Sequence, residues 1–287
     1  MDLQSLALVV ITLGAAVVNG ALGYGFSSIT VPLALLFLSN RVLNPALVVI
    51  EVPLNAYVLW VNRAALPRVW RRTFPIVLGL VPGVAIGTLI VARVSPGWLK
   101  LLTFAVLLPL ILLQAAGYRR PIRSERSIGL PFGCSVGVLY SVTTISGPPL
   151  ALLLNNQGFA KREFRAALGL VRLAESTFTA LAYLSAGLFA RESLALAPSM
   201  IPSVLIGVPV GAFVIRHIRV ETFRRVCMSF DAWVVGFGLS TLLRGLHIVD
   251  GSLAFLVLAA VVLVDGWLLY RFFLEAQPDV PRSFAGA

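Results

Sequence analysis

The sequence predicts an all-α polytopic membrane protein: an inverted repeat of one re-entrant (broken) helical hairpin plus three transmembrane helices, with one extra C-terminal transmembrane helix. Of its 287 residues, 59% are hydrophobic and only 12% are charged, whereas soluble globular domains carry about 25% charged residues. Apolar runs of about 20 residues alternate with short basic segments, as the thickness of a bilayer requires. These observations exclude an ordinary soluble domain and predict a multi-pass protein of the cell (inner or plasma) membrane.

The net charge of +11 would suggest nucleic-acid binding in a soluble protein. Here the arginines lie in short loops between apolar runs, which is typical of cytoplasmic loops. We therefore expect the lipid bilayer as a partner and no nucleic acid. Cys134 and Cys227 lie inside apolar segments and the chain has only two histidines, so the sequence predicts neither a disulfide framework nor a metal site, and no cofactor.

The N-terminal apolar run, Leu3 to Val18, has the length of a signal-peptide core. A signal peptide begins with a basic segment, and no Lys or Arg precedes Arg41. We therefore expect this run to remain in the mature protein.

The hydropathy of the sequence identifies nine apolar stretches. Seven are long single runs, at 44–62, 73–92, 98–116, 164–186, 195–215, 223–243 and 251–272. Two others, 4–39 and 127–157, are interrupted near their middles by residues rich in Gly, Ser and Thr. Their arms of about 11–16 residues reach roughly 17–24 Å, short of a hydrocarbon core of about 30 Å. Each stretch is either one broken crossing helix or a re-entrant hairpin.

The distribution of basic residues favours the re-entrant interpretation for the second stretch. If both stretches cross, the basic loops divide almost evenly between the two sides, against the inside bias. If the second stretch returns to its own side, 17 Lys and Arg residues become cytoplasmic and five stay outside.

The two halves also repeat. Pro32 to Leu36 and Pro149 to Leu153 have the same sequence, Pro-Leu-Ala-Leu-Leu. A hairpin plus three spans is an odd number of crossings, so the second copy must be inverted, as in many secondary transporters. We expect a first repeat at 1–118, a second at 119–247, and an additional helix and tail at 248–287.

The two interruptions predict a central polar site. Non-helical backbone at membrane depth is tolerated only where protein buries it or where it lines a watery cavity. Ser146 before Gly147 resembles a helix N-cap with prolines in the first turn, and Pro32 is expected near the start of its outgoing arm. Two helix N-termini facing the centre would favour an anion. The predicted substrate-binding residues are Asn19, Gly23, Tyr24, Gly25, Ser27, Ser28, Thr143, Thr144, Ser146, Gly147, Arg172 and Ser176.

The glycines have a second interpretation, in which they only allow close helix packing. For the breaks, packing does not explain the accompanying Ser and Thr residues. For Gly83 with Gly87, and for Gly207 with Gly211, packing is the preferred interpretation.

Ionisable residues within spans are costly and often functional. Glu51 and Asn55 are four residues apart and share a helix face, and Glu175 lies beside Arg172. Glu51, Asn55 and Glu175 are candidates for coupling to a proton or a sodium ion. Arg172 has two interpretations, as an anion ligand through its planar guanidinium or as a structural partner of Glu175 or Glu51.

The segment from Gly23 to Leu33 resembles the glycine-rich first signature of the TauE/SafE sulfite-exporter family, and Ser146 to Leu150 resembles its second copy. The resemblance covers roughly 5–243. It implies export of sulfite or of organosulfur anions such as sulfonates. Phe26 and Ser27 stand where the family commonly has glycines, which bears on the substrate more than on the fold.

Together these patterns predict a secondary transporter, and not an enzyme, that moves a small anion by alternating access around a site between the two hairpin tips. No phosphate-binding loop occurs that would indicate ATP use. The alternatives are a passive anion channel and a membrane-embedded hydrolase, which would need a nucleophile and a base that meet. The identity of the anion, the direction of transport and the oligomeric state are left open.

Overall fold

The computed structural model describes residues 3–116, 125–155 and 159–275, and the regular secondary structure in these ranges is helical. The first half contains α1 (Leu3–Leu22), α2 (Phe26–Ala34), α3 (Asn40–Val61), α4 (Leu66–Arg93) and α5 (Pro96–Ala115). The second half repeats this order with α6 (Glu125–Thr143), α7 (Gly147–Asn155), α8 (Lys161–Ser185), α9 (Arg191–Val214) and α10 (Val220–Gly245). A short 3₁₀ segment, Gly251–Phe255, leads into α11 (Leu256–Glu275).

Seven helices among the described residues are long and apolar enough to cross a membrane. They confirm six of the seven predicted long runs. The run predicted at 164–186 forms α8 but is not among the seven, because α8 carries a basic first turn and the charged pair Arg172 and Glu175. The N-terminal run, at Gln4–Leu22, is the seventh.

Both interrupted stretches break where predicted, but their arms are unequal. The first arms, α1 and α6, have 20 and 19 residues, and the second arms, α2 and α7, have nine each. The expected arms of about 11–16 residues were therefore wrong. A helix of 20 residues spans about 30 Å and one of nine residues about 14 Å, so each long arm reaches the depth of the bilayer and only the short arm is confined to half of it.

The breaks require unusual backbone conformations. Gly23 and Gly25 have φ angles of 82° and 110°, and Thr144 has a φ of 56°. The left-handed region is open to glycine and costly for a β-branched residue. The second break therefore holds its conformation through the surrounding structure rather than through glycine.

Side-chain contacts define two ends of the bundle. At the Arg41 end, the Arg41 guanidinium donates to the carbonyl oxygens of Val91, Ala92 and Val94 at 2.9–3.1 Å, and Lys100 Nζ donates to the Leu35 carbonyl at 2.8 Å. The ends of α2 and α4 and the starts of α3 and α5 thus meet there.

At the opposite, Arg68 end, Arg68 lies 3.8 Å from Glu163 and the Arg72 guanidinium lies 4.4 Å from the centre of the Phe159 ring. The basic segments at the starts of α4 and α8 therefore share one end, as the loop-charge argument expects. Which end faces the cytoplasm stays a prediction.

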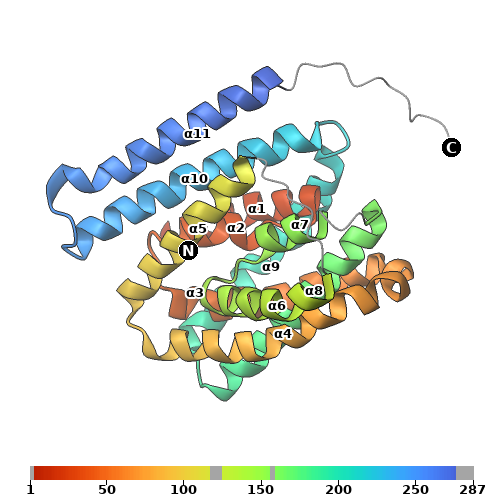
Figure 1. Cartoon of the computed structure of the whole chain (residues 1–287). Coiled ribbons are helices and arrows are strands. Elements are labelled where there is room, and N and C mark those ends of the chain that lie inside the picture. The colour runs from red at the N-terminus through yellow and green to blue at the C-terminus, as the bar shows by residue number, and fades with distance from the viewer. Residues whose placement is uncertain (1–2, 117–124, 156–158, 276–287) are drawn as a thin grey trace.

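Close helix pairs connect the halves. A Cβ placed on Gly211 of α9 would lie 1.9 Å from the Val17 carbonyl oxygen of α1, and one on Gly83 of α4 would lie 2.1 Å from the Cys134 carbonyl oxygen of α6. The packing interpretation of these glycines agrees with this geometry. In Figure 1, α6 lies beside α4, while α11 lies at the edge of the bundle beside α10.

The contacts also give the helix directions. Along α1, Val9 meets Ser203 of α9 and Val17 meets Gly211, so these two helices run parallel. Along α4, residue 76 meets residue 133 of α6 and residue 87 meets residue 138, so α4 and α6 are parallel as well. α9 begins at the Arg41 end, so its parallel neighbour α1 starts from that end. α4 ends at the Arg41 end, so its parallel neighbour α6 starts from the Arg68 end. The two long arms therefore enter from opposite ends.

The predicted boundary between residues 118 and 119 lies outside the described residues, as do Arg119, Arg120, Arg123 and Arg282 of the loop-charge count.

Candidate functional site

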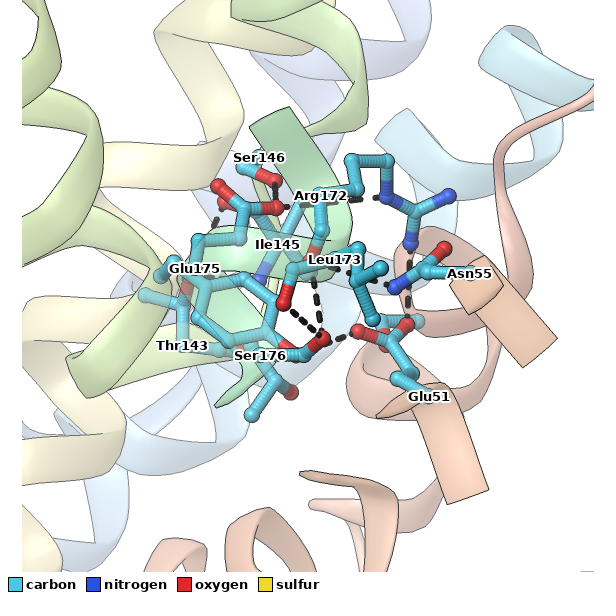
Figure 2. A network of polar contacts seen from close by, with 12 residues as sticks. Glu51, Asn55, Thr143, Ile145, Ser146, Arg172, Leu173, Glu175 and Ser176 are labelled. Atoms are coloured by element: carbon cyan, nitrogen blue, oxygen red, sulfur yellow. Dashed lines mark hydrogen bonds and ion pairs between the residues drawn. The ribbon is translucent and has the colours of Figure 1, made fainter. Parts of the chain in front are cut away.

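A buried ion-pair cluster lies where α3 and α8 pack together. Arg172 Nη2 is 3.0 Å from Glu51 Oε1, and Arg172 Nε is 3.9 Å from Glu175 Oε1. Glu51 and Glu175 are fully buried and Arg172 is 3% exposed. Glu51 and Arg172 each lie near the middle of their helices, and Figure 2 shows Arg172 extended between the two carboxylates. The cluster thus lies at the depth expected for a midplane site.

Hydroxyl groups from both breaks complete this cluster. Ser27, in the first turn of α2, donates to Glu51 Oε1 at 2.5 Å, and Tyr140, near the end of α6, donates to Glu51 Oε2 at 2.6 Å. Ser146, directly before α7, donates to Glu175 Oε1. Hydroxyls of both hairpins therefore bind Glu51, and the second hairpin also binds Glu175, so the two breaks lie beside the same ion-pair cluster.

The cluster holds more acids than bases. Two carboxyl groups face one guanidinium, so ionisation of both acids would leave one negative charge without a partner. Arg172 Nε and Glu175 Oε2 are buried without a hydrogen-bond partner, and such groups are rare in stable interiors. The arrangement can accept one further proton or cation, and it retains one unused donor and one unused acceptor.

Asn55 and Ser176 contact the same segment through the backbone. Asn55 Nδ2 donates to the Arg172 carbonyl oxygen at 3.4 Å, and Ser176 Oγ donates to it at 2.8 Å. Their predicted roles as a coupling residue and a ligand are not tested by these contacts. The contacts fix the turn of α8 that carries Arg172.

The helix starts correct the predicted register of the repeat. α7 begins 121 residues after α2, and α8 begins 121 residues after α3. Arg172 likewise lies 121 residues after Glu51, and each is the twelfth residue of its helix. Matching Pro32 with Pro149, 117 residues apart, displaces the halves by about one helical turn.

Of two expectations about the short arms, one was wrong and the other is confirmed for the backbone alone. Pro32 is the seventh of the nine residues of α2 and not near its start. Ser146 occupies the predicted N-cap position, because its carbonyl oxygen accepts from the Leu150 amide at 3.0 Å. Its hydroxyl, however, donates to Glu175 instead of to the first turn of α7.

The two tips also touch directly. Gly147 lies against Tyr24, because a Cβ placed on Gly147 would meet the Tyr24 ring at 3.0 Å. Gly25 is the residue before α2. Any larger side chain at position 147 would push the tips apart.

The hydroxyls of Thr143 and Thr144 are used within the second break. Thr143 Oγ1 accepts from the Ile145 amide at 3.0 Å and donates to the Leu139 carbonyl at 2.7 Å. Thr144 Oγ1 donates to the Thr143 carbonyl. In this conformation both residues stabilise the break.

Asn19 and Gly23 line a cavity of about 850 Å³ between α1, α3 and α9. The cavity extends to Asn62 and Arg165, at the Arg68 end, and its remaining lining is mainly apolar, including Leu54 and Val204. Asn19 Oδ1 is buried and has no hydrogen-bond partner. Ser28 lies apart from it, in a small cavity with Gln114 and Asp231.

A family model described as "Sulfite exporter TauE/SafE" matches residues 8–239. The chain belongs to the TauE/SafE family. No curated protein and no solved structure matches it. Members of this family are membrane exporters of sulfite and related anions, so the protein is a membrane-embedded transporter, as predicted. The match ends within α10, so α11 lies outside it.

The structure adds site residues that we did not predict in this TauE/SafE protein. Tyr140 donates to Glu51 from a segment that reads as apolar. Asn44 and Asn40 donate to the Val142 carbonyl at 2.7 and 3.4 Å, and Tyr183 donates to the Ser141 carbonyl. The four-residue spacing of Asn40 and Asn44 places them on one helix face, a pattern that the sequence already contained.

Proposed function

We propose that this TauE/SafE protein is a secondary transporter that exports a small oxyanion, such as sulfite or an organosulfonate, by alternating access. The observation that supports this most is the position of Arg172. It is a buried cation at mid-helix depth, and hydroxyls from both helix breaks bind its partner carboxylates. Ionisable groups at such depth mark substrate and ion pathways.

Arg172 serves as the anion site by exchanging partners. A guanidinium binds oxyanions through two parallel N–H donors. One of these groups, Nη2, is occupied by Glu51, while Nε has no hydrogen-bond partner. An anion that replaces the Glu51 carboxylate keeps the charge on Arg172 balanced. The displaced Glu51 retains Ser27 and Tyr140 as donors.

Asn19 and Gly23 are the predicted ligands on the access side. They line the large cavity, which extends to Asn62 and Arg165 at the Arg68 end and serves as the route from that end. On the opposite side, Asn40 and Asn44 of α3 bind the Val142 carbonyl and so hold the end of α6 against α3, which closes the access from the Arg41 end. The arrangement fits a conformation that is open toward one end only.

Alternation between the two ends follows from an inverted repeat of residues 1–118 and 119–247. Its supports are the repeated helix order, the opposite entry of α1 and α6, and the pairing of Glu51 with its equivalent, Arg172. In such repeats the two halves exchange roles around a fixed site. Residues 248–287 lie outside this exchange.

Coupling to an ion gradient is part of the proposal. Glu51, Asn55 and Glu175 remain the coupling candidates at the anion site, since the cluster has two carboxyl groups and one guanidinium. A proton on one acid, or a sodium ion beside it, would balance the cluster. When the substrate replaces Glu51 on Arg172, the displaced Glu51 can bind the coupling ion, so anion binding and ion binding are linked.

The test is flux in liposomes that contain the purified protein, with labelled sulfite, sulfonates, sulfate and carboxylates. A carrier gives saturable flux and counterflow, in which an internal anion accelerates uptake of an external one. Flux without saturation or counterflow would identify the passive channel instead. A protein that carries none of these anions would contradict the proposed function.

A further inference from the structure

Asp231 is a buried acid that the anion site does not use. It is the twelfth of the 26 residues of α10 and 7% exposed. Among the described residues it has no hydrogen-bond or ion-pair partner, whereas Glu51 and Glu175 lie beside Arg172 and Asp265 lies 2.8 Å from Arg225. Of the four buried acids in the described part of the chain, Asp231 alone has no cation beside it.

The surroundings of Asp231 disfavour a carboxylate. It lines a cavity of about 20 Å³ with Ser28 of α2 and Gln114 of α5, and most of the remaining lining is apolar. The first turn of α7 borders the same cavity with Pro148 and Pro149. Proline has no backbone N–H, so this helix start lacks two of the donors that normally stabilise an anion.

Among the residues that the structure describes, no charged group compensates Asp231 from the helices packed around it. The titratable neighbour is the Cys227 thiol, one turn earlier on α10. Arg225 faces α11, where it contacts Asp265, and Arg224 pairs with Glu221 near the start of α10. The described residues of α1, α2, α5, α7 and the Gly251–Phe255 segment contribute no charged side chain to the cavity.

An uncompensated carboxylate in an apolar interior neutralises by taking up a proton. The cavity has room for about one water molecule, which needs two to four polar partners. Asp231, Ser28 and Gln114 provide three. A proton leaving the Asp231 carboxyl group therefore has a first acceptor, with the O–H bond of the acid broken and the proton passed to that water.

The two short arms connect this cavity to the anion site. On α2, Ser27 binds Glu51 while the adjacent Ser28 lines the Asp231 cavity. Beside α7, Ser146 binds Glu175 while Pro148 lines the same cavity. A shift of either arm on anion binding thus changes the surroundings of Asp231.

We propose that Asp231, and not one of the three coupling candidates, is the proton-binding site that links anion transport to a proton gradient, so that Glu51, Asn55 and Glu175 serve the anion site alone. The proposal rests on the proposed transport function. Asp231 holds its proton while the short arms close the cavity, and it releases the proton when they move. One proton crosses the membrane for each such cycle.

A first test needs no substrate. Infrared spectra of the purified protein report the C=O stretch of protonated carboxyl groups. At neutral pH we expect one such band to be lost in Asp231→Asn and retained in Asp250→Asn, which changes an acid that is 91% exposed. An unchanged set of bands in Asp231→Asn would show that Asp231 is ionised, and would overturn the proposal.

A second test measures coupling in liposomes with the membrane potential clamped to zero. The probe is methanesulfonate, a strong acid whose charge is constant near neutral pH. With one proton per anion, a pH gradient of about one unit supports about a tenfold anion gradient. We expect this accumulation in the wild type and in Asp250→Asn, and a ratio of about one in Asp231→Asn, which keeps its counterflow.

The outcomes separate the two proposals. Tenfold accumulation by Asp231→Asn, or wild-type accumulation that follows sodium and not pH, would exclude Asp231 as the coupling site. Absence of flux for every anion in the wild type would refute the transport function, whereas the infrared band would still decide whether Asp231 carries a proton. Ser28→Ala gives a further check, since loss of a water partner should slow pH-driven flux and leave counterflow unchanged.

Discussion

Replacement of Arg172 by glutamine separates its structural role from its role as an anion ligand. The change leaves Glu51 and Glu175 without the cation that lies 3.0 and 3.9 Å from them. Loss of one partner of a buried ion pair costs about 3–5 kcal/mol. Because Ser27, Tyr140 and Ser146 still donate to the acids, we expect a cost near the lower end of this range.

The structure also predicts which acid restores stability. Charge interactions weaken with distance, so Glu51→Gln should rescue the Arg172→Gln variant better than Glu175→Gln does. The assay is the fraction of purified protein that stays monodisperse after heating over a range of temperatures. Equal rescue by both changes, or no loss of stability in Arg172→Gln, would contradict the ion-pair geometry.

The ligand role is tested in the same series. Arg172→Lys keeps the charge but loses the planar fork. A lost charge-assisted hydrogen bond is worth about 1.5–3 kcal/mol, which is roughly tenfold or more in affinity, so substrate affinity should fall while stability changes little. If the double variant with Glu51→Gln regains both stability and transport, Arg172 is not a direct ligand.

Three further predictions follow from the helix ends, the tips and the helix seams. Single cysteines at Arg123 and Lys161, which flank the second interrupted stretch, should both react with impermeant reagents from the cytoplasm, and one at Arg191 from outside; reaction of the first two from opposite sides would refute the re-entrant hairpin between them. Gly147→Trp should abolish flux while the protein remains folded, because its Cβ already meets Tyr24 at 3.0 Å; normal flux would show that the contact between the tips is dispensable. Gly211→Leu should cost about 3 kcal/mol in thermal stability, the upper end for overpacking, whereas Gly14→Leu, where a Cβ meets nothing within 4 Å, should be nearly neutral; equal melting temperatures would argue against the close contact of α1 with α9.

The sequence predicted the helical class and the breaks because both depend on local composition. Runs of apolar residues set the helices, and Gly, Ser and Thr mark the interruptions. The lengths of the arms could not be predicted, since the same apolar residues allow a helix to start or stop several positions away. Thr144 shows the limit most clearly, because no sequence signal indicates a positive φ at a threonine.

The polar site was only partly predictable. Glu51 and Arg172 stand out as charges inside apolar segments, but their mutual contact depends on how α3 and α8 pack. Tyr140 was missed because an aromatic residue in an apolar run resembles core until its hydroxyl finds a partner. The alignment of the two halves that we predicted from Pro32 and Pro149 differs from the alignment of the helix starts by about one turn, because the two prolines occupy different turns of α2 and α7.

The glycine seams restrict which parts of the molecule can act as independent bodies. At Gly211 and Gly83 the backbones of α1 with α9, and of α4 with α6, are in direct contact, and closely interdigitated helices do not slide freely. We expect each pair to move as one lever during transport, with the nine-residue arms as the movable tips. The distance moved during transport is then limited by these short helices, which are about 14 Å long. A cross-link between α1 and α9, or between α4 and α6, should leave turnover intact. A cross-link between a short arm and α3 should stop turnover.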